Sequence, residues 1–160
     1  NTGGGIWKAS WFFDKNEPFL IHNADVLSDI NLGDLVNFHN SRQAMATLSV
    51  RKRKASRYLL FDEKMQLSGW KNPNTGEQVY TTEKKVAYLY GFSSIYVINP
   101  AIFNVYTNDT SKDFSIIDVF LDLARAYPVI GYRDDTHQWF DVGTPEKLKK
   151  AEEFGHYFLY

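Results

Sequence analysis

The sequence alternates short apolar runs with helix-start signals, and this order restricts the fold more than any other feature. The run Phe19–Asn23 is almost continuously apolar, and residues 44–50 form a second such run, as is typical of strands covered on both faces. Between the two runs, Asn31 and Asp34 form a helix-start pattern, and helical spacing also follows Thr2. The order helix, strand, helix, strand predicts an α/β fold with parallel strands joined by crossovers.

The rest of the chain continues this pattern without an interdomain linker. A length of 160 residues suits one domain, which we expect to span residues 1–160. The further elements that the sequence predicts are a hairpin of residues 57–61 and 66–70, a polar excursion to about residue 80, a strand over 86–97, a helix from Ser115, a closing hairpin of residues 129–132 and 138–141, and a last helix from Thr144.

The charge balance and the absence of cysteine exclude several classes of protein. The chain has 18 basic and 19 acidic side chains, a formal charge of −1, and no cysteine. Near neutrality argues against generic binding to nucleic acid or to an anionic membrane. A disulfide scaffold and a thiolate zinc site are impossible. No apolar run approaches the roughly 20 residues of a membrane span, so we expect a soluble, cytoplasmic protein.

Two aspartates are the strongest candidates for chemistry. Asp25 follows the predicted strand Phe19–Asn23, at the end of a strand where open α/β sheets bind their ligands. Asp141 ends another predicted strand, just before Gly143 and the predicted helix start at Thr144. A pair of carboxylates in such positions suits Mg²⁺. Taken alone, each aspartate is better explained as a turn residue that caps backbone N–H groups, and the sequence does not show that the two meet.

Three further features carry weaker signals. The glycines of Thr2-Gly3-Gly4-Gly5 expose backbone groups at a helix start, which suits a flat ring or an anion, although the segment does not match the P-loop pattern. The basic run Arg51–Lys54 fits a solvated strand end better than a phosphate site at this net charge. Lys71, beside Trp70, could reach a substrate phosphate or face water.

Four segments together resemble the sugar-1-phosphate nucleotidyltransferase family. They are Thr2-Gly3-Gly4-Gly5-Ile6, Pro18-Phe19-Leu20-Ile21-His22-Asn23-Ala24-Asp25-Val26, Phe114-Ser115-Ile116-Ile117-Asp118-Val119 and Trp139-Phe140-Asp141-Val142-Gly143-Thr144-Pro145-Glu146-Lys147-Leu148. The resemblance extends over nearly the whole chain. It is greatest to bacterial members similar to mannose-1-phosphate guanylyltransferase and to N-acetylmuramate-1-phosphate uridylyltransferase.

The resemblance implies a Rossmann-like, GT-A-like fold, with a mixed, mainly parallel sheet and helices on both faces. It also implies a function, which is Mg²⁺-dependent transfer of a nucleotidyl group from an NTP to a sugar 1-phosphate, with release of pyrophosphate. By the family pattern, Asp25 and Asp141 hold the Mg²⁺ and are the catalytic residues, and Gly3 and Gly4 lie against the nucleobase. Residues that contact the sugar phosphate by the same pattern are Asn23, Lys71, Ser93 and Ser94.

The sequence departs from the family pattern in several places. Ala24 and Ser94 stand where glycine is common, and Lys71-Asn72-Pro73 replaces Glu-Lys-Pro. The family's opening strand and its glycine-rich pyrophosphate loop do not occur in this sequence. We therefore expect these residues to be the carboxyl-terminal portion of a longer enzyme and to be inactive alone. Two alternatives stay open, namely a non-catalytic regulatory or nucleotide-sensing domain, and a GT-A glycosyltransferase, although the latter normally has Asp-x-Asp where this chain has Asn23-Ala24-Asp25.

Overall fold

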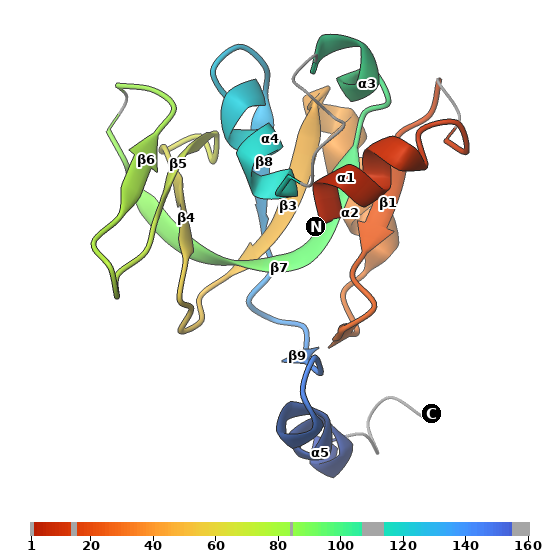
Figure 1. The fold of residues 1–160 in the computed structure, drawn as a ribbon, viewed down its shortest axis with the longest axis vertical. Helices are drawn as coiled ribbons and strands as arrows, with labels where there is room; N and C mark the ends of the chain where they lie inside the picture. The colour runs from red at the N-terminus through yellow and green to blue at the C-terminus, as the bar shows by residue number, and fades with distance from the viewer. Residues whose placement is uncertain (1, 14–15, 84, 107–113, 155–160) are drawn as a thin grey trace.

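The computed structural model describes residues 2–13, 16–83, 85–106 and 114–154 (Figure 1). The elements follow in the order α1 (Thr2–Lys8), β1 (Phe19–His22), β2 (Val26–Ser28), α2 (Leu32–Arg42), β3 (Ala46–Arg51), β4 (Tyr58–Phe61), β5 (Leu67–Lys71), β6 (Gln78–Tyr80), β7 (Tyr88–Ile98), α3 (Ile102–Val105), α4 (Ile116–Leu123), β8 (Val129–Arg133), β9 (Trp139–Asp141) and α5 (Pro145–Phe154).

The long strand β7 organises a seven-stranded mixed sheet (Figure 1). The strands follow in the order β6-β5-β4-β7-β3-β8, and β1 also pairs with β7. Strands β1, β3 and β4 run antiparallel to β7, β8 runs parallel to β3, and β6 has the same direction as β4 because both are antiparallel to β5. Five of the seven strands therefore point the same way. The predicted α/β fold with a mixed sheet is confirmed, with β7 lying between the parallel strands β1 and β3.

Apolar side chains cover the sheet on both faces because β7 alternates between two cores. Tyr96 and Ile98 belong to the larger core with α1, α3 and α4, whereas Ile95 and Val97 belong to a smaller core with Leu35 of α2. All five of these side chains are fully buried. The prediction of helices on both faces is therefore confirmed.

Local signals placed the helix starts correctly. The Asn31 side chain accepts a hydrogen bond from the backbone N–H of Asp34 at 3.1 Å and caps α2. Ser115 caps α4 in the same way through the N–H of Ile117. Helix α1 ends at Lys8, well before Pro18, and leaves Trp11 83% exposed.

The predicted closing hairpin is wrong. Strand β8 pairs with β3 in the main sheet, and β9 pairs with β2 in a separate two-stranded sheet. The polar excursion also contains a strand, since β6 pairs with β5 through residues Gln78–Tyr80. In the described part of the chain, no helix is both long enough and apolar enough to cross a membrane.

Candidate functional site

The two-stranded sheet brings the predicted aspartates together. Asp141 is the last residue of β9 and pairs in register with Val26, the first residue of β2. The backbone N–H of Val142 donates a hydrogen bond to the carbonyl of Asp25 at 2.8 Å. Asp25 and Asp141 therefore occupy adjacent positions although they lie far apart in the sequence.

One oxygen of each carboxylate lies close to Gly143. A methyl carbon placed on Gly143 would lie 3.2 Å from Asp141 Oδ1 and 3.3 Å from Asp25 Oδ2. A side chain at this position would require the two carboxylates to shift by a few tenths of an ångström. Two carboxylates are the donor set that Mg²⁺ accepts, with waters and substrate phosphates as its remaining ligands. The described residues contain no group of three or more His, Cys, Asp or Glu side chains suited to a metal.

Asp141 carries a well-stabilised negative charge. Its Oδ2 accepts a hydrogen bond from Lys147 Nζ at 2.7 Å, and its Oδ1 accepts one from the N–H of Gly143 at 3.0 Å. The Lys147 hydrogen bond is the main cause that holds the pKa of Asp141 below its usual value, aided by the Gly143 N–H and the charge of Arg53. The carboxylate is therefore ionised at neutral pH.

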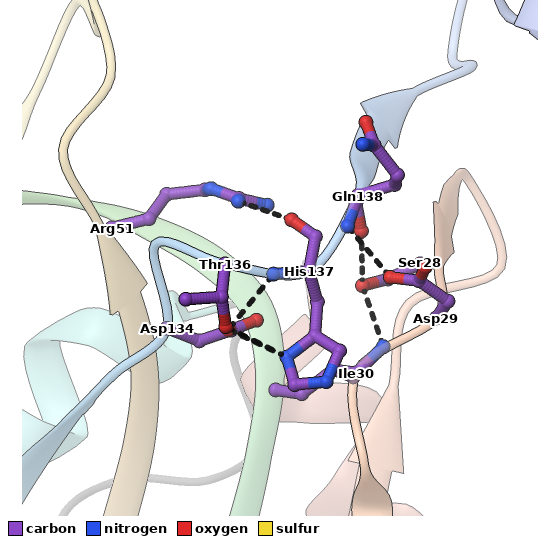
Figure 2. Close-up of polar contacts among 8 residues, drawn as sticks. All are labelled: Ser28, Asp29, Ile30, Arg51, Asp134, Thr136, His137 and Gln138. Atoms are coloured by element: carbon purple, nitrogen blue, oxygen red, sulfur yellow. Dashed lines mark hydrogen bonds and ion pairs between the residues drawn. The ribbon is translucent and has the colours of Figure 1, made fainter.

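The loop between β8 and β9 folds around a buried aspartate (Figure 2). Asp134 accepts hydrogen bonds from the backbone N–H of His137 at 3.3 Å and from its Nδ1 at 2.7 Å. Burial alone would raise the pKa of Asp134, but the hydrogen bonds from His137 outweigh it and lower the pKa. Arg51 of β3 donates to the His137 carbonyl at 2.6 Å, so the loop is also tied to the main sheet.

A second group of hydrogen bonds ties this loop to β2 (Figure 2). The N–H of Gln138 donates to Asp29 Oδ1 at 2.6 Å, and its carbonyl accepts from Ser28 Oγ at 2.7 Å. These contacts fix the start of β9 against the end of β2. They therefore set the register that places Asp141 beside Asp25.

Trp139 anchors β9 to the main sheet. Its Nε1 donates to the carbonyl of Ser93 at 2.8 Å, and the Arg53 guanidinium lies 4.4 Å from the ring centroid. Arg53 also donates to the carbonyl of Phe92 at 2.8 Å. A cation stacked on an aromatic face in this way keeps its charge while it packs.

A pocket of about 300 Å³ opens beside Asp141. Its lining includes two arginines, Arg53 and Arg57, together with Trp70, Ser94 and Asp141. The Arg57 guanidinium lies 5.2 Å from the ring centroid of Trp70. Two cations and a metal-suited carboxylate around one cavity favour a phosphorylated ligand. A larger depression of about 540 Å³ lies elsewhere and contains none of the predicted site residues.

Three predicted sugar-phosphate residues meet at an irregularity of β7. The pairing of β3 with β7 shifts register opposite Ser93 and Ser94. The N–H of Asn23 donates to the carbonyl of Ser94 at 3.1 Å. Ser94 has φ 59°, in the left-handed region that glycine adopts without strain. A strained residue that lines a pocket is a recurrent feature of binding sites.

The other predicted residues lie apart from this pocket lining. Lys71 ends β5 opposite Tyr58 and is not among the lining residues. Gly3 and Gly4 are buried in α1. A side chain on Gly3 would come within 2.6 Å of the Phe114 ring, so close packing of α1 against α4 already requires glycine there.

Sequence reasoning missed the arginines and Lys147. The run at 51–54 is not a uniformly solvated strand end, because Lys52 and Lys54 are exposed while Arg51 and Arg53 are half-buried. In the sequence, arginine and lysine alternate at residues 51–54 with the period of a strand, and this pattern separates Arg53 from the two lysines. Arg57 comes three residues after this run, and the sequence around it does not distinguish it from an ordinary surface arginine. Lys147 stands at the sixth position after Asp141, and helical geometry alone does not direct its side chain back to that carboxylate.

Comparison with known proteins gives a family and a fold. The sequence model of a family described as "Nucleotidyl transferase" matches residues 1–156. Among curated proteins, no sequence match was found. Solved structures that share the fold include a protein assigned as a glucose-1-phosphate thymidylyltransferase from Bacillus anthracis, with a TM-score of 0.68 and 12% identity over 95% of this chain and 59% of that one.

Two further structures are similar at comparable levels. HddC from Yersinia pseudotuberculosis has a TM-score of 0.64 and 19% identity, over 96% of this chain and 62% of that one. The inositol-1-phosphate CTP transferase from T. maritima has a TM-score of 0.62 and 14% identity, over 92% of this chain and 58% of that one. The chain thus spans about three fifths of the length of these structures.

Proposed function

This chain belongs to the nucleotidyl transferase family, and from that premise we propose that it transfers a nucleotidyl group from an NTP to a sugar 1-phosphate. In this reaction an oxygen of the sugar phosphate attacks the α-phosphorus of the NTP. The bond from that phosphorus to the bridging oxygen breaks, and pyrophosphate leaves. By the sequence resemblance, the proposed activity is similar to that of a mannose-1-phosphate guanylyltransferase.

One observation carries the proposal, namely that Asp25 and Asp141 meet beside a pocket lined by two arginines. Asp25 and Asp141 fit Mg²⁺ because both are carboxylates and one oxygen of each lies close to the same residue, Gly143. Bound there, Mg²⁺ would supply charge neutralisation for the phosphates. Phosphoryl-type transfer depends mainly on positioning and on such neutralisation, so this arrangement of charges suits the reaction.

The pocket suggests how the acceptor is held. Arg53 and Arg57 are placed to bind the phosphate of the sugar 1-phosphate, since a guanidinium pairs with phosphate through two parallel hydrogen bonds. Asn23, Ser93 and Ser94 form the segment proposed to contact the sugar. Lys71, one residue beyond Trp70, is assigned only a longer-range contribution to neutralising the phosphate.

The nucleotide is assigned to other parts of the protein. Gly3 and Gly4 are proposed to lie against the nucleobase on the family pattern alone, since both are buried and Phe114 already packs against Gly3.

The test uses the natural full-length protein with a panel of NTPs and sugar 1-phosphates, and it measures pyrophosphate release. We expect Asp141→Asn and Asp25→Asn to lower turnover at least a hundredfold and to weaken binding of Mn²⁺ measured by electron paramagnetic resonance. Asp34→Asn is the matched control, because it makes the same chemical change on the exposed surface of α2. Wild-type turnover in Asp141→Asn would refute the assignment.

A further inference from the structure

Lys147 stands directly beside the proposed cation site. Its Nζ lies 2.7 Å from Asp141 Oδ2, and the two side chains are 49% and 38% exposed. The start of α5 holds Lys147 in this place, because its backbone N–H donates to Thr144 Oγ1 at 3.4 Å. The helix start therefore places the backbone of Lys147, and the end of β9 places that of Asp141.

Both oxygens of Asp141 already have partners. Oδ1 accepts the N–H of Gly143, and Oδ2 accepts Lys147 Nζ. A hard divalent cation binds carboxylate oxygens at about 2.0–2.1 Å and requires near-ideal geometry. An ammonium within hydrogen-bond distance of the same carboxylate repels that cation and competes for its oxygen. The Lys147 ammonium and a bound cation therefore cannot both interact closely with the Asp141 carboxylate.

We propose that Lys147 is a built-in counter-ion of Asp141, which a divalent cation must displace in order to bind. This inference rests on the proposed function, since it requires Asp25 and Asp141 to be the cation site. In the absence of metal, Lys147 neutralises the charge of the Asp141 carboxylate. When a cation takes its place, the ammonium is released next to a pocket suited to phosphate.

The proposal predicts that removal of the Lys147 charge strengthens metal binding. Lys147→Gln removes the competitor, so the variant should bind Mn²⁺ about threefold to fivefold more tightly than the wild type, the scale expected of an exposed ion pair. Lys150→Gln is the matched control, because it removes the same charge from an exposed position on the same helix. We expect Lys150→Gln to bind Mn²⁺ like the wild type.

The experiment measures Mn²⁺ affinity by electron paramagnetic resonance for the wild type, both lysine variants and Asp141→Asn, each checked for folding by circular dichroism. Equal or weaker binding by Lys147→Gln, with binding lost in Asp141→Asn, would overturn the role of Lys147 and leave the metal assignment intact. Undiminished binding by Asp141→Asn would instead overturn the proposed cation site. As a second readout, Mg²⁺ should shift the ¹⁵N signal of the Lys147 ammonium in the wild type, and an unchanged signal would contradict displacement.

Discussion

A buried histidine makes the stability of this protein sensitive to mild acid. His39 lies on the inner side of α2 and is only 1% exposed. Its Nδ1 is 3.0 Å from Thr47 Oγ1 on β3. Burial lowers the pKa of His39 from 6.5 to about 4, because the protonated ring would lose its hydration. The folded protein therefore keeps this ring neutral at a pH where the unfolded chain protonates it.

The sign and the size of the effect follow from this difference. Because the unfolded chain binds more protons, stability is complete above pH 6.5 and falls as the pH drops toward about 4. At roughly 1.4 kcal/mol per pH unit, acidification to pH 5 should cost about 2 kcal/mol. The carboxylates of Asp134 and Asp141 have lowered pKa values, so their contribution is lost only in stronger acid.

Urea denaturation at pH 7.5 and at pH 5.0 measures this cost. With an m value of about 2 kcal/mol/M, the midpoint should fall by about 1 M. His39→Gln is the control, because glutamine can hydrogen-bond to Thr47 but does not titrate. The variant should be less stable at pH 7.5 and should lose most of the pH dependence. An equal fall of the midpoint in His39→Gln and in the wild type would refute this account of His39.

Three other substitutions test the pocket and the loop that leads to it. Gly91→Ala would place a methyl carbon 2.7 Å from Arg53 Cγ. We expect the substitution to displace Arg53 and to raise the KM for the sugar phosphate about tenfold in steady-state kinetics. An unchanged KM would contradict this. Asp134→Ala removes the acceptor for His137 and should cost about 2–3 kcal/mol in urea denaturation, whereas a loss below about 0.5 kcal/mol would count against the loop's role. Ser94→Gly relieves a φ of 59° and should raise stability by about 1 kcal/mol, measured in the same way; a loss would show that the serine side chain contributes more than its strain.

Features that depend on neighbours in the sequence were predictable. The caps Asn31 and Ser115 were found because a capping side chain acts on a backbone N–H two or three residues away. The hairpin of β4 and β5 was found for the same reason, since a short turn joins the two strands. In each case the interaction that decides the structure lies within a short sequence window.

Features that depend on distant partners were not predictable. The turn near Asp134 suggested a hairpin of β8 and β9, yet β8 pairs with β3, and β9 pairs with β2. A turn shows only that the chain changes direction. It does not show which strand the segment after the turn pairs with. The half-burial of Arg53 depends likewise on Trp139, which arrives from another element. The sequence predicted that Asp25 and Asp141 each stand at the end of a strand, but it did not show that the two residues lie side by side.

The geometry of the proposed cation site is set by residues that do not belong to it. Asp141 ends β9 of the small two-stranded sheet and Asp25 immediately precedes β2, so the main ladder of hydrogen bonds does not fix their separation. Trp139 instead holds β9 to β7, and Ser28 holds it to β2. A small hard cation requires its ligands to be placed accurately. Loss of the Trp139 and Ser28 hydrogen bonds should therefore weaken cation binding more than it lowers the stability of the fold. The residues around the site therefore decide its affinity as much as the two carboxylates do.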